Sequence, residues 1–194
     1  ASGNMVIDVG GGTTDIAVLS LGGVVISQSV RVGGDKLDEA IIRHLRKKFN
    51  LMIGERTAEI LKIEIGWAVP PREEKAADVK GRDLVSGLPK MITITASEIY
   101  KCLSEPLSSI VDAARIILEH TPPELAADIG EKGICLTGGG SLLHGMDEMI
   151  GKALATPTYV AEDPISCVAL GAGKVLDNLK SLREGFLYTK RRNS

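Results

Sequence analysis

Apolar residues at the start of the chain fall in short runs separated by glycine. Residues 5–8 form a run that closes on Asp8 just before a glycine cluster, and this pattern predicts a short buried strand. Two longer apolar runs, 14–21 and 24–32, flank the pair Gly22-Gly23. Because two glycines between such runs are typical of a tight turn, they predict a β-hairpin.

The pattern then changes from strand-like to helical. Between 35 and 49 apolar positions recur every four residues, which predicts a helix. These positions are Leu37, Ile41, Leu45 and Phe49. Asp35 precedes them and is expected to cap the helix. A second helix is predicted over 55–65, with Pro70-Pro71 ending it.

The middle of the chain is more polar. The charged stretch 72–80 is predicted to be a loop, and the runs 79–85 and 90–95 predict a second hairpin. A long helix is predicted over 97–120. Because Pro106 sits inside it, we expect either a kink or two separate pieces.

The last third repeats a strand–helix rhythm. A strand is predicted over 133–137, followed by a glycine turn and a helix that begins with Ser141 as its cap and ends near 155. A strand over 158–160 and a helix over 163–179 follow. Hairpins first and strand–helix units later predict an α/β fold with a layered core.

Composition narrows the class of protein. Hydrophobic residues make up 44% and charged residues 25%, which is typical of a packed domain. The 23 basic and 25 acidic side chains give a net charge of −2, and there are only 2 Phe, 3 Tyr and 1 Trp. A basic, aromatic surface for nucleic acid is therefore not expected. No run reaches the roughly 20 apolar residues of a membrane-spanning helix.

The glycine cluster after the first strand is the first candidate site. Gly10, Gly11 and Gly12 allow bare backbone N–H groups to approach a ligand, and successive N–H groups in such a turn bind anions. Thr13 adds a hydroxyl donor. This pattern favours a phosphate-binding turn.

Two carboxylates flank this turn. Asp8 is placed to hold Mg²⁺ through water, since Mg²⁺ bridges phosphates and keeps several of its waters. Asp15 lies just beyond, where it is placed to order a hydrolytic water. A glycine-rich hairpin with an aspartate in its turn is the purely structural alternative.

A second glycine turn, formed by Gly138, Gly139 and Gly140 and followed by Ser141, links a predicted strand to a predicted helix. A flat or anionic ligand can lie on such a backbone. A tight strand-to-helix turn without a ligand is the alternative.

A third constellation lies on the predicted helix over 55–65. Glu55, Glu59 and Lys62 are four and three residues apart, so they share one helix face. On spacing alone, a solvated surface with an ion pair is the simpler interpretation.

Taken together, these motifs resemble a known family. Residues 5–15 resemble the second phosphate motif of the actin superfamily. Other segments are similar to bacterial MreB and its Mbl-like paralogues, and the resemblance runs from about Gly3 to Leu179. These segments are 33–38, 54–59, 81–84, 121–125, 136–143 and 161–164.

The resemblance implies a fold and a domain organisation. The expected fold is domain II of an actin-like ATPase. Its ribonuclease-H-like core, subdomain IIA, would comprise residues 1–32 and 95–194. Residues 33–94 would form a smaller inserted α+β subdomain, IIB.

The resemblance also implies a function. It points to a cytoplasmic filament protein at the inner face of the membrane that binds ATP or ADP with Mg²⁺ and organises cell-wall synthesis and rod shape. Its partners would be further copies of itself and proteins of cell-wall synthesis and morphogenesis.

The family's site residues transfer onto matching positions of this chain. Gly10 to Thr13 would contact the β- and γ-phosphates, and Asp8 would act on Mg²⁺. Glu59 and Lys62 would flank the ribose and the adenine. Gly138 to Ser141 would back the adenosine.

The first half of the family's fold has no counterpart in this sequence. That half supplies the opposite phosphate loop, the acidic residue that positions water and the membrane-inserting segment. We therefore expect a C-terminal half with one wall of the cleft, weak Mg-dependent ATP binding and no useful turnover. Half of another actin-superfamily ATPase or sugar kinase is one alternative, and a nucleotide-independent interaction module is another.

Overall fold

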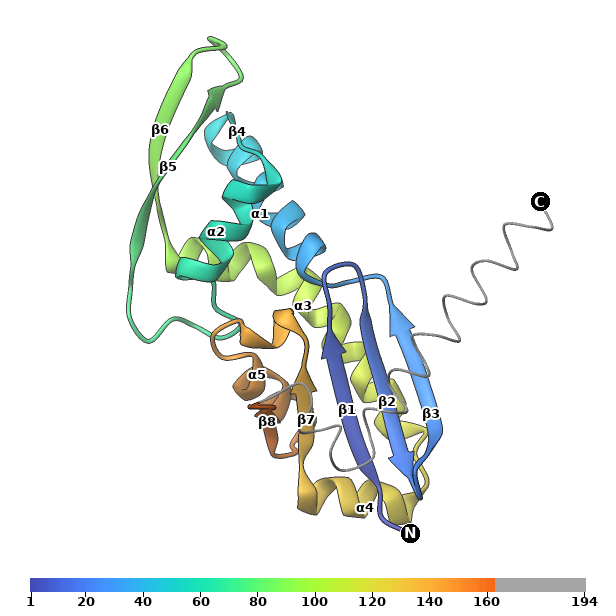
Figure 1. Cartoon of the computed structure of the whole chain (residues 1–194). Helices are drawn as coiled ribbons and strands as arrows, with labels where there is room; N and C mark the ends of the chain where they lie inside the picture. The colour runs from blue at the N-terminus through green and yellow to red at the C-terminus, as the bar shows by residue number, and fades with distance from the viewer. Residues whose placement is uncertain (163–194) are drawn as a thin grey trace, which may run out of the picture.

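The computed structural model describes residues 1–162, which build two sheets and the helices packed against them (Figure 1). The larger sheet has the strand order β3-β2-β1-β7-β8. β1, β2 and β3 are antiparallel, whereas β7 and β8 run parallel to β1. The strands are β1 (Asn4–Val9), β2 (Thr14–Ser20), β3 (Gly23–Val30), β7 (Ile134–Thr137) and β8 (Thr158–Val160).

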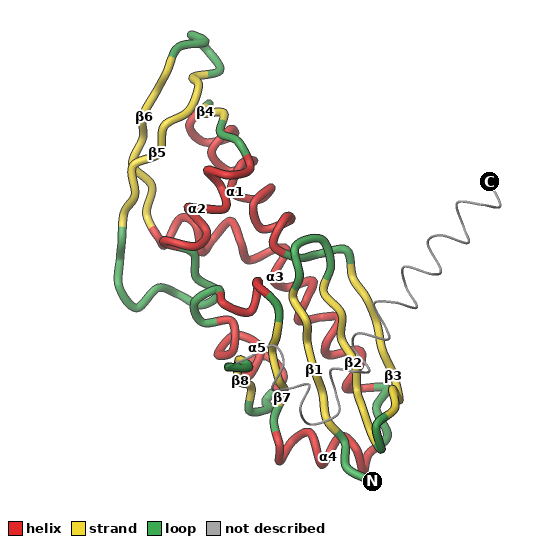
Figure 2. The backbone as a smooth tube through the Cα atoms, in the orientation of Figure 1, coloured by secondary structure: helices red, strands yellow, loops and turns green. Residues whose placement is uncertain are grey.

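The smaller sheet is antiparallel and has the order β4-β5-β6. Its strands are β4 (Leu51–Met52), β5 (Ala76–Asp83) and β6 (Pro89–Thr95). Figure 2 places it apart from the larger sheet and beside the helices α1 (Gly34–Phe49) and α2 (Glu55–Ile65). Whether residues 33–94 form a separate subdomain stays a prediction.

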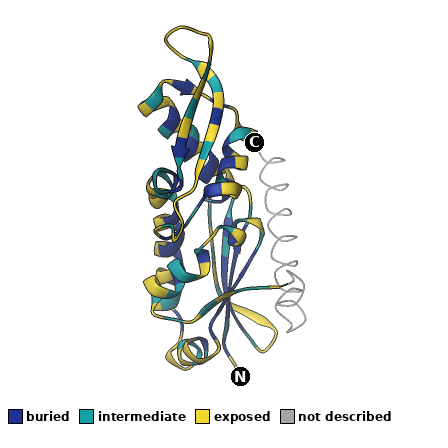
Figure 3. Ribbon diagram, turned by 90° about the vertical axis from the view of Figure 1, so that its left-hand side faces the viewer, coloured by how far each residue is buried: buried dark blue, intermediate teal, exposed yellow. Residues whose placement is uncertain are grey.

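The long helix α3 (Ala96–Glu119) joins the two regions, because it packs against α1 and against β2 and β3. α4 (Pro123–Lys132), the short 3₁₀ helix η1 (Gly139–Leu142) and α5 (Met146–Leu154) follow. Strand alternation points Met5, Ile7 and Val9 into the main core, while Val6 lies on the opposite sheet face. Figure 3 shows the helices gathered on one side of the larger sheet, with buried residues between them.

Most predicted elements are confirmed. The strands of the larger sheet, the helices over 35–49 and 55–65 and the long helix over 97–120 agree with the observed bounds to within two residues. The second hairpin is also found. In the described residues, no helix is long and apolar enough to cross a membrane.

Two predicted helix caps are wrong. α1 is capped by Gly33 without a side-chain hydrogen bond, so Asp35 lies in the first turn, where its charge suits the helix dipole. Ser141 does not begin a long helix. Instead, its hydroxyl donates to the carbonyl of Gly138 at 2.5 Å inside η1, and α5 begins only after Gly145, whose φ is +77°.

Two further features differ from the prediction. Residues 72–80 are not all loop, since β5 begins at Ala76; most of its side chains are exposed or half-buried, so charged residues fit there. α2 ends at Ile65, as predicted, and its C-cap is Gly66 rather than one of the prolines. α3 continues through Pro106 as one helix, so the division into two pieces is wrong. The helix predicted over 163–179 lies outside the described residues.

The helix α4 was not predicted from the sequence. Pro123 stands at its first position and Ile129 is its only fully buried residue. With so few apolar positions, its periodicity is weak.

Candidate functional site

The two glycine turns follow β1 and β7 at the carboxyl ends of these strands, on the same side of the larger sheet. β1 and β7 are parallel neighbours with Asp8 opposite Thr137, so the turns that follow them lie side by side. A side chain on Gly138 would lie 2.5 Å from Asp8 Oδ1, and one on Gly140 would overlap Val9. Only glycine therefore allows the second turn to pack this closely against the end of β1.

The first turn is held by the N-terminus of α1. The Gly34 N–H donates to the carbonyl of Gly10 at 2.9 Å, and the Asp35 N–H donates to that of Gly11 at 2.8 Å. Within the turn, the Gly10 N–H donates to Thr13 at 2.9 Å. These three hydrogen bonds therefore occupy the carbonyls of Gly10 and Gly11 and the N–H group of Gly10.

The N–H groups of Gly11 and Gly12 remain for a ligand. Neither donates to any residue in the part of the chain that the structure describes. Both glycines are exposed. Two adjacent N–H groups on an exposed, braced turn suit an anion such as a phosphate.

A cavity of 560 Å³ joins this turn to the other two predicted constellations. It is bordered by both glycine turns and by α1 and α2. The predicted residues that line it are Gly10, Gly11, Glu59, Lys62, Gly139 and Gly140. Three separate sequence motifs therefore meet around one space, and its size suits a small-molecule ligand.

An ion pair in the wall of the cavity joins α1 to α2. Lys62 Nζ lies 2.8 Å from Asp38 Oδ1, and it also donates to the carbonyl of Gly34 at 3.2 Å. Because this short contact joins an ammonium group to a carboxylate, charge attraction holds it. Burial raises the pKa of Asp38, and the neighbouring Lys62 opposes that shift.

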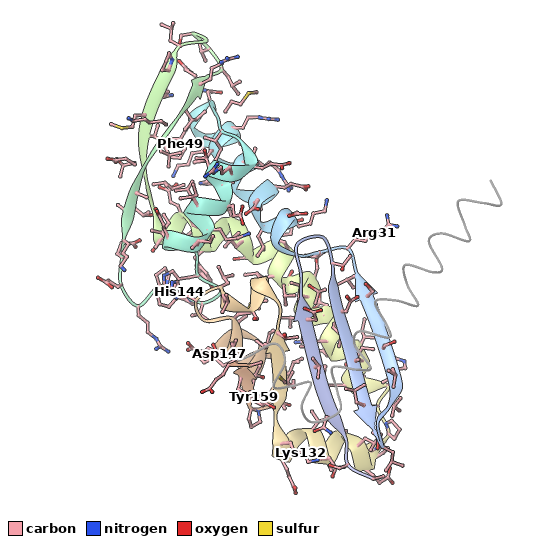
Figure 4. All side chains as sticks on the ribbon, viewed as in Figure 1. Arg31, Phe49, Lys132, His144, Asp147 and Tyr159 are labelled. Atoms are coloured by element: carbon pink, nitrogen blue, oxygen red, sulfur yellow. The ribbon has the colours of Figure 1, made fainter. Side chains whose placement is uncertain are left out.

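Apolar side chains provide another part of the wall. Ile63 is 65% exposed and Leu142 is 76% exposed, and both line the cavity. His144 also lines it and packs on Trp67, with ring centroids 5.0 Å apart. Figure 4 shows His144 where the segment after α2 meets the loop before α5. Such apolar surfaces suit a flat ring.

The remaining predicted residues border the site without lining the cavity. Asp8 is buried, and Asp15 stands directly opposite it on β2, so both carboxylates share one sheet face. Gly12 and Thr13 complete the first turn. Gly138 and the buried Ser141 shape the second turn.

The donor set fits Mg²⁺ only in a phosphate-bound form. The described residues contain no group of three or more carboxylate, histidine or cysteine ligands. Mg²⁺ is commonly held by one or two carboxylates together with waters and substrate phosphates, and Asp8 beside the first glycine turn is compatible with such an arrangement.

Several cavity residues were not predicted from the sequence as site residues. They are Gly34, Asp35, Leu37, Asp38, Ile63, Leu142, Leu143 and His144. A usable signal was present for some of them, because Asp35 and Asp38 follow a glycine pair at a helix N-terminus. Ile63, Leu142 and His144 carry no such signal, since they reach the cavity only through packing.

The fold and site together define an actin-like α/β protein. A family model described as "MreB/Mbl protein" matches residues 1–184, and the chain belongs to this family. It is 51% identical over 190 residues to the cell shape-determining protein MreB of Escherichia coli, covering 98% of this chain and 54% of that protein. The chain thus spans about half the length of the curated relatives it matches.

Solved structures agree with this assignment. MreB5 of Spiroplasma citri bound to ADP superposes with a TM-score of 0.83 at 40% identity, over 94% of this chain and 56% of that one. MreB5 has also been solved with AMPPNP. The MamK double helical filament matches with a TM-score of 0.70 at 23% identity, over 83% of this chain and 50% of that one, and supports the fold alone.

Proposed function

We propose that this chain is the nucleotide-binding half of an ATP-dependent, filament-forming protein that determines cell shape by organising cell-wall synthesis. The observation that carries the proposal is the 560 Å³ cavity in which the two glycine turns and α2 meet. The nucleotides bound to MreB5 and the cell-shape role in the name of the E. coli relative support it. Morphogenesis proteins at the inner face of the membrane would be its partners.

Different residues of the chain would bind the phosphates, the Mg²⁺ ion and the hydrolytic water. The N–H groups of Gly11 and Gly12, with Thr13, would hold the β- and γ-phosphates. Gly10 would contribute space, because its own N–H is already used within the turn. Asp8 would orient the waters of Mg²⁺, and Asp15, on the same sheet face, would order a water for hydrolysis.

The other end of the cavity would take the nucleoside. Glu59 and Lys62 would meet the ribose and the base, and the second glycine turn would lie behind them. Ile63 and Leu142 would cover the faces of the adenine ring, because both are exposed apolar side chains of the cavity wall.

Replacing Asp8 with alanine is expected to weaken Mg-ATP binding by about tenfold or more, because it removes the carboxylate next to the phosphate turn. Isothermal titration calorimetry with Mg-ATP, and with ATP in EDTA, measures this directly. The unchanged chain should bind weakly and prefer Mg-ATP. The variant should lose that preference.

Asp147→Ala is the matched control, since Asp147 is an exposed carboxylate on α5 (Figure 4). It should bind as the unchanged chain does. Equal affinity of Asp8→Ala and the unchanged chain would reject the role of Asp8. Robust phosphate release by this chain alone would reject the expectation that one wall of the cleft excludes too little water for catalysis.

Self-association is proposed to use the tip of the β5–β6 hairpin, which projects from the body of the molecule (Figure 1). Val85 is 80% exposed and Leu88 is 64% exposed there. The double substitution Val85→Asp and Leu88→Asp should weaken self-association by about tenfold, since it replaces two apolar contacts with charge. Sedimentation velocity over a concentration series measures the change.

Leu21→Asp is the control for that experiment, because Leu21 is 84% exposed in the other hairpin turn. An equal effect of both changes would mean that general surface hydrophobicity drives association. Association that ignores nucleotide would favour the interaction-module alternative. The family assignment speaks against a sugar kinase, and phosphate transfer to a sugar panel tests that alternative.

A further inference from the structure

A second cavity lies between α1 and α3 and shares no lining residue with the nucleotide cavity. It has a volume of 320 Å³, and we name it the α1–α3 groove. Lys36, Arg43 and Lys47 line it from α1, and Cys102, Glu105 and Pro106 line it from α3. The function proposed above uses none of these residues.

The cations of this groove form one stripe. Positions 36, 43 and 47 are seven and four residues apart, so they share a helix face. At 1.5 Å per residue the stripe is about 16 Å long, the length of about five extended residues. It stands out on a chain whose net charge is −2.

Two of the cations have no acidic partner in the described part of the chain. Lys36 pairs with Glu39 at 3.1 Å, whereas no ion pair holds Arg43 or Lys47. Lys47 lies in the last turn of α1, where it also suits the helix dipole. Arg43 lies before that turn, so dipole stabilisation does not account for it.

The floor of the groove is apolar. Val32, Ala40 and Pro106 line it. Because proline has no N–H, Pro106 leaves the carbonyl of Cys102, four residues earlier, without its helix hydrogen bond. The Cys102 thiol donates to Ile99 at 3.1 Å, and burial raises its pKa to about 12, so it acts here as surface rather than as a nucleophile.

We propose that the α1–α3 groove binds an acidic, extended peptide segment of a partner protein, with an apolar side chain between its carboxylates. The carboxylates would meet Arg43 and Lys47, and the apolar side chain would lie on the floor. A concave groove fits a narrow chain better than a flat membrane. Glu105, which also lines it, opposes a dense polyanion such as nucleic acid.

The probe for this proposal is a fluorescein-labelled peptide of sequence EELEEL, with QQLQQL as its uncharged counterpart. Fluorescence anisotropy with the 194-residue chain should show binding of the first peptide alone, weakening as salt rises. The double substitution Arg43→Gln and Lys47→Gln should weaken binding by about tenfold or more. Amide shift changes in an NMR titration should map to residues 36–47 and 102–109.

The matched control is Lys80→Gln with Lys132→Gln, which removes the same charge from exposed positions on β5 and α4. Lys132 is labelled in Figure 4. It should bind EELEEL as the unchanged chain does, and both double variants should keep the same thermal midpoint. If both double variants weakened binding equally, the peptide would be held by the overall charge of the chain rather than by the groove, and the proposal would be overturned. Competition by millimolar inorganic phosphate, or stronger binding to phosphatidylglycerol vesicles than to the peptide, would assign the groove to a simple anion or to a membrane instead.

Discussion

Gly33→Ala is expected to lower the free energy of unfolding by about 2 to 3 kcal/mol and to remove measurable ATP binding. A side chain at this position would overlap the carbonyl oxygen of Gly10 and lie 2.7 Å from that of Gly11. Both atoms belong to backbone that α1 holds through two hydrogen bonds. Backbone cannot move aside as easily as a side chain can, so α1 and the first glycine turn must separate.

Urea unfolding and calorimetry with Mg-ATP measure the two effects in the same protein. Gly130→Ala is the control, because Gly130 lies inside α4 with open space around it. That change should raise stability by about 0.5 to 1 kcal/mol, as alanine does inside a helix, and leave binding intact. If Gly33→Ala kept both stability and binding, the turn would not depend on its contact with α1.

The sequence predicted the elements best where one period dominates. The strict four-residue repeat of α1 and the glycine pair between β2 and β3 are local signals, so they survive in the fold. Ser141 shows the limit of such signals. A serine after glycines favours a helix cap, but the close approach of Gly138 and Gly140 to Val9 imposes a 3₁₀ turn instead.

The residues of the candidate site also differ in whether a local sequence signal predicts them. The glycine turns were predictable, because bare backbone beside carboxylates is visible in the sequence. Their meeting with α2 was indicated by a family resemblance rather than by spacing. The Asp38–Lys62 pair was not predicted, because 24 positions separate the two residues and only the packing of α1 against α2 joins them. The sequence therefore predicted the glycine turns of the cavity better than its helical wall.

Lys62→Met is expected to lower the free energy of unfolding at neutral pH by about 2 to 3 kcal/mol. Lys62 is 14% exposed and Asp38 is 11% exposed, so the pair is mostly shielded from water. Without the ammonium group, a carboxylate that is already hard to ionise loses its only cation among the groups that shift its pKa. Burial and the charges of Glu59 and Asp35 then all oppose its ionisation.

The pH dependence tests this cause directly. A carboxyl whose pKa is higher in the folded than in the unfolded chain costs stability while ionised, and the cost disappears as pH falls through the folded pKa. In Lys62→Met the pKa of Asp38 should rise further, so the stability deficit should shrink between neutral pH and about pH 5. Urea unfolding at both pH values measures it.

The double variant Asp38→Asn with Lys62→Met separates charge from packing, since it keeps the shape of Asp38 but removes its ionisation. Its stability relative to the unchanged chain should not show the recovery at low pH seen in the single variant. A deficit of Lys62→Met that stays constant with pH would mean that the lysine acts through its stem and its bond to Gly34. The recovery would instead identify the ion pair as the link that holds α1 and α2 together at the cavity wall.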